Sequence, residues 1–103
     1  MKNRNKKYSG LTLPFTGYLP RSFERAWKDN QSLQRLWNND GDLSNDVEKA
    51  DFLLIKEAIK NNIYDIRDLY AILILKPEGA FQKLDKDESY LRIIISRAIY
   101  EWA

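Results

Sequence analysis

The chain has 103 residues, 44% of them hydrophobic and 13% aromatic, which is enough for one compact domain with its own core but not for two. It contains neither Cys nor His, so disulfides, thiolate metal sites and imidazole acid–base chemistry are excluded. The net charge of +2 is uneven: residues 1–35 carry eight Lys or Arg against two acids, and residues 36–103 carry nine against thirteen, which indicates an acidic or polyanionic partner or a solubilising tail.

The N-terminal 21 residues form a predicted arm. Residues 1–10 are polar and basic, with no apolar run of a secretory signal behind them. Residues 11–20 contain two Pro and one Gly, which exclude a helix and favour an extended strap. The apolar side chains of this strap must cover the domain's own core or dock on another protein. No apolar run reaches the roughly 20 residues that span a bilayer, so we expect a cytoplasmic protein.

A helical domain is predicted over residues 22–103, and it opens with two short helices. Ser22 is the expected N-cap of the first, in which Phe23, Ala26 and Trp27 follow helical spacing. The second spans about Ser32 to Trp37 and repeats that spacing. A loop, residues 38–44, follows.

The longest apolar pattern predicts a helix from Asn45 to about Asn61. Asn45 and Glu48 form a capping-box pattern at its start. Its inner stripe is wide, which suggests a central helix contacted from more than one side. The stripe comprises Val47, Ala50, Leu54 and Ala58, flanked by Phe52, Leu53, Ile55 and Ile59.

Two further helices complete the predicted all-α bundle of about five helices. Asp65 caps the first, residues 66–75, with Ile66, Leu69, Tyr70 and Leu73 expected on its inner face and Pro77 and Gly79 ending it. Asp87 caps the last. Its inner stripe is expected to contain Leu91, Ile94, Ile95, Ala98, Ile99 and Trp102.

The pair Asp40 and Asp42, which flanks Gly41, has the composition of a two-metal nucleotidyl-transfer site. Such a site needs further carboxylates and phosphate-binding bases. The alternative is an acidic helix start, where negative charge is favourable by about 0.3–1 kcal/mol. A calcium loop from Asp40 is rejected, because its obligatory Gly position holds Asn45. We expect neither a catalytic residue nor a metal or cofactor.

Basic residues interleaved with aromatic ones are the stronger functional signal. Single-stranded nucleic acid is bound by cations that meet phosphates and by flat rings that stack on bases. The alternatives are a solvated basic face and core positions for Trp27 and Trp37, which both lie on apolar stripes. The candidate nucleic-acid-binding residues are Lys2, Arg4, Lys6, Lys7, Arg21, Arg25, Lys28 and Arg35.

Residues 36–102 also carry a family resemblance. The run Leu36-Trp37-Asn38-Asn39-Asp40, then Glu48-Lys49-Ala50-Asp51-Phe52, then Tyr90-Leu91-Arg92, resembles the small helical domain on the C-terminal side of phage and plasmid primase-polymerases. The chain departs from that pattern in three places. Asn39 stands where Gly is usual, Lys49 interrupts a Glu-Ala-Asp run, and Asn61-Asn62 replace a Gly-rich turn.

The resemblance implies a helper role rather than an active site. In that family the helical domain assists primer initiation by contacting template or incoming nucleotide. A free-standing copy with a basic arm is similar to small proteins encoded beside an A-family DNA polymerase in cassette-chromosome mobile elements. This implies a partner subunit that binds the polymerase and lets it start DNA primers de novo. Asp40 and Asp51 match family positions. We expect them to be structural, with a backbone or Trp partner for Asp51, or to contact a basic residue of the polymerase.

The sequence therefore predicts a non-catalytic accessory subunit of an A-family DNA polymerase that contacts a single-stranded DNA template. Two alternatives stay open: a free-standing single-strand-binding or regulatory protein, and a metal-dependent nucleotidyl transferase based on Asp40 and Asp42. The strap is the predicted polymerase-docking segment, because it is apolar and Pro holds it extended. Its docking residues are Leu11, Leu13, Phe15, Tyr18 and Leu19.

Overall fold

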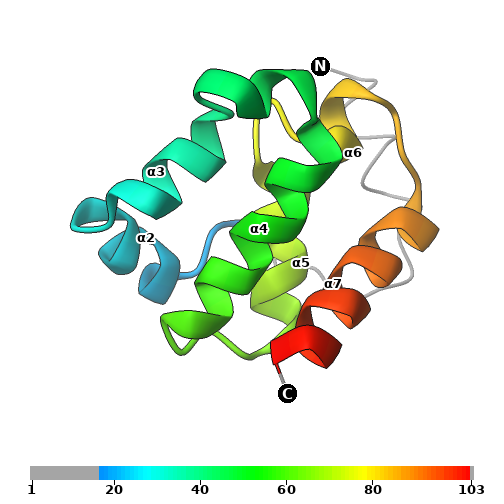
Figure 1. Cartoon of the computed structure of the whole chain (residues 1–103). Helices are drawn as coiled ribbons and strands as arrows, with labels where there is room; N and C mark the ends of the chain where they lie inside the picture. The colour runs from blue at the N-terminus through cyan, green and yellow to red at the C-terminus, as the bar shows by residue number, and fades with distance from the viewer. Residues whose placement is uncertain (1–16, 103) are drawn as a thin grey trace.

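Residues 17–102, the part that the computed structural model describes, contain six α-helices and one 3-10 helix and no strand (Figure 1). The predicted all-α class is confirmed. In chain order the elements are α2 (Arg21–Lys28), α3 (Gln31–Asn38), η1 (Gly41–Asn45), α4 (Val47–Lys60), α5 (Ile66–Leu75), α6 (Ala80–Lys83) and α7 (Glu88–Trp102). Among them, no helix combines the length and the apolar character needed to cross a membrane.

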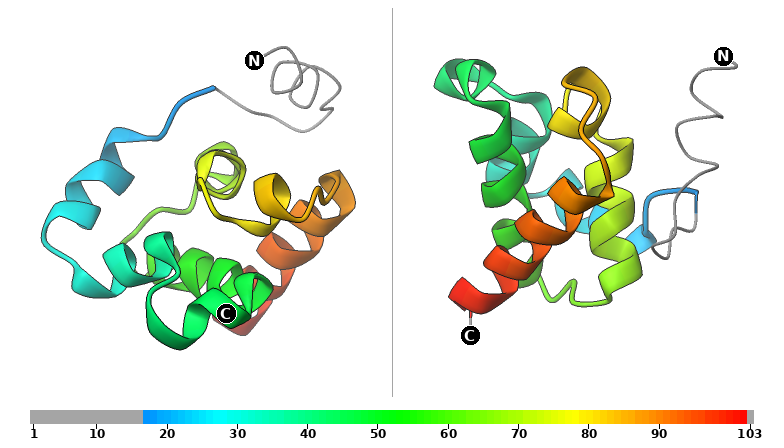
Figure 2. Two further views of the ribbon diagram at one scale, coloured as in Figure 1. Left: turned by 90° about the horizontal axis from the view of Figure 1, so that it is seen from above. Right: turned by 90° about the vertical axis from the view of Figure 1, so that its right-hand side faces the viewer.

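Helix α4 is the hub of the bundle, as its wide apolar stripe predicts. It packs against α3 on one side and α7 on the other, and it also contacts α5, α6 and η1. In Figure 1, α4 crosses in front of α5. Figure 1 and the view from above in Figure 2 show α2 and α3 forming a corner at one edge of the molecule. Val47, Ala50, Leu54, Ile55 and Ala58 are buried along it, so the predicted inner stripe is confirmed.

Helix α5 is buried more completely than its amphipathic pattern suggests. Every residue from Leu69 to Ile74 is buried, because the helix is enclosed by α4, α6 and α7. An all-apolar helix of this kind belongs in the interior. Ile66 is an exception to the predicted inner face: it is 44% exposed in the first turn.

The predicted stripe of α7 is correct for about two turns and wrong at its end. Leu91, Ile94, Ile95 and Ala98 are buried. Ile99 and Trp102 are 40% and 51% exposed. Helical periodicity shows which side chains share a face, but it does not show how far the neighbouring helices extend along that face.

The N-terminal caps of α2, α3 and α4 differ from the predictions by one or two residues. Helix α2 begins at Arg21 after Pro20, so Ser22 lies in its first turn and Arg21 belongs to the bundle rather than to the arm. Helix α3 begins at Gln31, one residue before the predicted start near Ser32, and its cap is Asn30, whose Oδ1 accepts from Leu33 N at 3.0 Å. Asn and Ser are both favourable caps, so local chemistry alone does not fix where α3 starts. At α2 the cap position holds Pro20, which forms no side-chain cap bond.

At α4 the cap is Asp46, whose Oδ1 accepts from Lys49 N at 3.1 Å. The expected cap, Asn45, instead ends η1, a 3-10 helix where a loop was predicted. Helix α6 was also not predicted, because four residues are too few to show a periodicity. The caps Asp65 and Asp87 are confirmed: each accepts a hydrogen bond from a backbone amide of the helix it opens.

Two of the three departures from the family pattern coincide with left-handed backbone. Asn39 has φ 53° after α3, and Asn62 has φ 68° after α4. This region suits Gly, and Asn enters it more readily than other residues because it has a short polar side chain. Both Asn residues therefore have a conformation that Gly would also allow.

Candidate functional site

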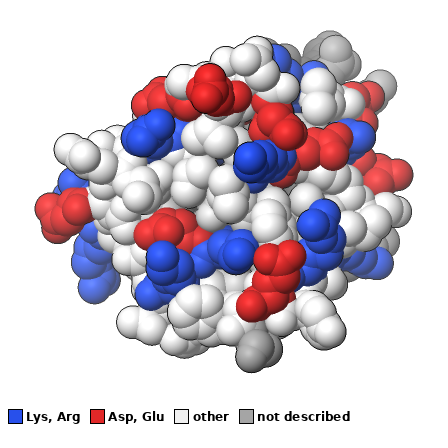
Figure 3. Space-filling model, viewed as in Figure 1, with Lys and Arg blue, Asp and Glu red and all other residues white. Residues whose placement is uncertain are grey.

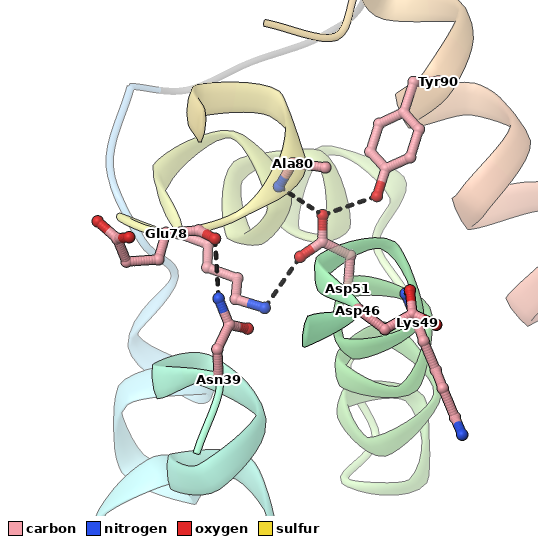
Figure 4. A network of polar contacts seen from close by, with 8 residues as sticks. Asn39, Asp46, Lys49, Asp51, Glu78, Ala80 and Tyr90 are labelled. Carbon is pink, nitrogen blue, oxygen red and sulfur yellow. Dashed lines mark hydrogen bonds and ion pairs between the residues drawn. The ribbon is translucent and has the colours of Figure 1, made fainter. Parts of the chain in front are cut away.

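A buried carboxylate at the centre of the bundle joins three elements that lie far apart in the sequence (Figure 4). Asp51, on α4, is fully enclosed. Its Oδ1 accepts from Lys76 Nζ at 2.9 Å, and its Oδ2 accepts from Ala80 N at 3.0 Å and from the Tyr90 hydroxyl at 2.8 Å. One side chain thus binds the end of α5, the start of α6 and the first turns of α7.

Local sequence places each partner of Asp51. Lys76 follows the last residue of α5 just before Pro77, which cannot continue the helix. Ala80 N is the first amide of α6 and has no partner within that helix. Its pairing with Asp51 satisfies the expected backbone partner for this carboxylate, whereas the expected Trp partner is replaced by Lys76 and Tyr90.

Burial controls the protonation of both side-chain partners. Desolvation lowers the pKa of Lys76 from its ordinary value, and the Asp51 carboxylate opposes this change by favouring the ammonium. Desolvation also raises the pKa of the Tyr90 hydroxyl, and the charge and hydrogen bond of Asp51 raise it further. Tyr90 is therefore a hydrogen-bond donor throughout the physiological range.

The corner after α3 is tied to the same region. Asn39 is buried and donates from Nδ2 to Glu78 O at 2.8 Å, while its Oδ1 is buried with no hydrogen-bond partner in the described part of the chain. Gly79 lies against the stem of Lys76, since a Cβ at position 79 would come within 3.2 Å of Lys76 Cβ. The turn between α5 and α6 is therefore held from both α3 and α4.

Asp51 is coordinated by donors on both oxygens and is closed to solvent, so it is placed to hold the bundle together rather than to meet a substrate. The family-motif positions divide accordingly. Asp51 and Tyr90 bond to each other, Leu36 and Trp37 pack against the core, and Glu48 forms a surface ion pair with Lys86 at 3.0 Å.

Asp40 and Asp42 lie elsewhere, on the surface at η1. Both are exposed, and both line a groove of about 690 Å³ between α3, η1, α4 and the end of α7. Three cations, Arg35, Lys56 and Lys60, line the same groove. Within residues 17–102 no three acidic groups gather as a metal site would require.

The predicted nucleic-acid-binding residues lie partly outside the described range. Lys2, Arg4, Lys6 and Lys7 belong to residues 1–16, as do the docking residues Leu11, Leu13 and Phe15. The other four cations are exposed: Arg21, Arg25 and Lys28 on α2, and Arg35 on α3. The spacing of the α2 residues places them on one face, with Glu24 among them.

These four cations share a property that distinguishes them from most others in the described range. None of them forms an ion pair there. Of the nine remaining Lys and Arg in that range, seven do: Lys56, Lys60, Arg67, Lys76, Lys83, Lys86 and Arg92. Arg25 and Lys28 also lie in the last turn of α2, where a cation interacts favourably with the helix dipole.

An aromatic groove lies beside the same face of α2. It has a volume of about 410 Å³, and within the described range it is lined by Leu19, Phe23, Glu24, Trp27, Lys28 and Trp37. Phe23 is buried and packs on Trp37 with ring centroids 5.3 Å apart. Trp27 and Trp37 are half-buried, so each packs on the core and also presents surface to the groove. The indole Nε1 of Trp27 is buried and has no hydrogen-bond partner among residues 17–102.

The strap residues that the structure describes behave differently from each other. Tyr18 is 71% exposed, whereas Leu19 packs against the core and forms one wall of the groove. On the face drawn in Figure 3, Lys and Arg are interspersed with Asp and Glu and do not form a broad patch of one sign. On that face, a cationic contact therefore depends on particular side chains rather than on a broad positive surface.

Comparison of the chain with protein-family models, curated proteins and solved structures finds no match to any of the three.

Proposed function

We propose that this protein is a non-catalytic accessory subunit that binds an A-family DNA polymerase and enables it to start DNA primers, by contacting the single-stranded template. Starting a primer requires that a template and two nucleotides be held without a duplex to grip. A bound helper with cations and flat rings can supply part of that hold.

The observation that carries the proposal is the set of four exposed cations at the α2–α3 corner that form no ion pair with other described residues. One of them, Lys28, lines a groove walled by Trp27 and Trp37. Most other cations in the described range are neutralised by a neighbouring acid. An unpaired surface cation can exchange its counterion for a phosphate without first breaking an ion pair.

The motif residues also support a non-catalytic reading. Asp51 and Tyr90, two positions that carry the family resemblance, are hydrogen-bonded to each other inside the bundle. Asn39 and Asn62 have left-handed backbone, a conformation that Gly adopts easily, at two places where the family has Gly. The resemblance therefore rests on residues that shape the domain, and the contact residues lie at its surface.

The strap is the proposed polymerase contact. Tyr18 is exposed and continues the apolar run of Leu11, Leu13 and Phe15, which lie outside the described residues. An extended segment with alternate apolar side chains can dock in a partner's groove or along a sheet edge.

The same unpaired cations favour a second candidate, a free-standing single-strand-binding protein without an enzyme partner. The two candidates differ in one measurable respect. Only the accessory subunit changes what a polymerase does.

The test is co-expression of the chain with an A-family DNA polymerase from the same replicon, followed by co-elution and by primer synthesis on an unprimed single-stranded template. We expect co-elution, and priming only when both proteins are present. A variant with Arg21, Arg25 and Lys28 changed to Ala should still co-elute but prime poorly. The control is Lys83→Ala, which removes a cation that is ion-paired with Glu78 and should behave as wild type. Absence of association together with equal priming by the polymerase alone would refute the proposal.

A further inference from the structure

We infer that the groove between α2 and α3 is a binding slot for an unstacked base of single-stranded DNA, with the cations of α2 following the adjacent phosphates. The inference deepens the proposed template contact and rests on it. It names the part of the surface, the chemical group that enters it and the ring that receives it.

The first support is the chemistry of the walls. Leu19, Phe23, Trp27 and Trp37 give the groove an apolar and aromatic lining, and its volume of about 410 Å³ lies within the range of small-ligand sites, about 300–1,000 Å³. Every nucleobase, whatever the sequence, has a π-face that can stack on such rings, whereas the sugar and the phosphate have none.

Charge complementarity identifies the occupant as part of a polyanion. Lys28 lines the groove itself, and Arg21 and Arg25 lie on the same helix face, all three exposed and without ion pairs among the described residues. An apolar peptide would fit the rings but would leave these cations unused. A nucleotide uses both, because its base enters the slot and its phosphates remain outside.

One acidic residue also belongs to the slot. Glu24 also lines the groove, and a carboxylate there opposes phosphate approach. Changing Glu24→Gln should therefore raise DNA affinity, which is the opposite of the effect of neutralising its cationic neighbours.

The experiment compares two oligomers that have equal charge and length. One is a dT 12-mer, and the other is a 12-mer of abasic deoxyribose phosphates. Binding of the full-length chain is followed by anisotropy at one salt concentration. Wild type should bind the abasic oligomer about 5- to 150-fold more weakly, the range expected for one stacked base. In Trp27→Leu the ratio of the affinities for the dT and the abasic oligomer should fall toward one. In the control Trp102→Leu this affinity ratio should not change.

Equal affinities of wild type for the two oligomers would overturn the inference. They would favour an apolar peptide segment as the occupant of the groove. Loss of the ratio in Trp102→Leu but not in Trp27→Leu would overturn it as well, since the base would then stack elsewhere. If Trp27→Leu does not fold, the Trp102→Phe chain decides instead. Its remaining Trp emission, from Trp27 and Trp37, should be quenched by the dT oligomer and not by the abasic one, and equal quenching would refute the slot.

This outcome is separable from that of the proposed function. Base-dependent binding without polymerase association would refute only the proposed accessory role. Polymerase-dependent priming without base-dependent binding would refute only the proposed base-binding slot.

Discussion

The hydroxyl of Tyr90 lies 2.8 Å from Oδ2 of Asp51, across 39 residues of sequence and inside a bundle where that carboxylate has no contact with water. This bond fastens the first turns of α7 to α4, and Lys76 and Ala80 fasten the α5–α6 turn to the same carboxylate. Buried polar groups in such a network are stabilising only when every member is satisfied. Its members should therefore be sensitive to conservative changes.

Removal of the Tyr90 hydroxyl is the mildest such change. Tyr90→Phe leaves the ring in place but removes one donor from a buried carboxylate, so we expect a loss of about 1.5–3 kcal/mol in the free energy of unfolding. Urea denaturation measures it. The matched control is Tyr100→Phe on the same helix, which should have no effect because Tyr100 is 84% exposed. Equal stabilities of the two variants would show that the Tyr90–Asp51 bond contributes nothing.

Removal of the Lys76 charge should be more damaging. Lys76→Met keeps the apolar stem but leaves Asp51 as a buried carboxylate without its cation, and breaking a buried pair in this way costs about 3–5 kcal/mol. Lys56→Met is the surface comparison, since its pair with Glu101 is partly exposed and surface pairs contribute about 0–1 kcal/mol. Thermal and urea unfolding of both variants distinguish the two cases. A loss below about 1 kcal/mol in Lys76→Met would contradict the role of the pair.

The network also predicts a pH dependence at alkaline pH. The folded state raises the pKa of Tyr90 above its ordinary value of 10.0, so the stabilisation is complete below pH 10.0. Above it the unfolded chain releases a proton that the folded chain keeps, and stability falls by up to about 1.4 kcal/mol per pH unit. Tyr90→Phe should lose stability less steeply above pH 10.0 than wild type. Parallel stability curves for the two proteins would contradict this linkage.

The left-handed residue after α4 provides a test of backbone conformation. Asn62 has φ 68°, a region in which a Cβ-bearing residue costs about 1–2 kcal/mol. Asn62→Ala should therefore be less stable than Asn62→Gly by about that amount. Both variants lose the side-chain oxygen that accepts from the Tyr64 hydroxyl, so this exposed bond cancels in the comparison. Equal unfolding midpoints would indicate that the turn relaxes.

The cationic contacts are tested by the salt dependence of DNA binding. Each phosphate contact removed from a single strand should reduce the slope of log affinity against log salt by about 0.7. Arg25→Ala and Lys28→Ala should each do so, and deletion of residues 1–8 should flatten the slope further. Lys86→Ala, which removes a cation paired with Glu48, is the control and should leave the slope unchanged. If neither the two substitutions nor the deletion changes the slope, then Arg25, Lys28 and the arm do not contact phosphates.

Sequence alone determined the parts of this protein that depend on neighbours within one helical turn. The all-α class, the hub stripe of α4 and the caps Asp65 and Asp87 all follow from i to i+4 spacing and from the side chains that bond nearby amides. The helices predicted to start at Ser22, near Ser32 and at Asn45 start one or two residues away from these positions, because local capping chemistry permits more than one start.

Only the tertiary structure decided which distant groups meet. Nothing in the sequence indicated that Asp51 pairs with Lys76 and Tyr90, because this pairing depends on how α4, α5 and α7 cross. The exposure of Ile99 and Trp102 and the separation of Asp40 from Asp51 were decided in the same way. Periodicity specifies a face of a helix, but burial and pairing require the partner surface that covers that face.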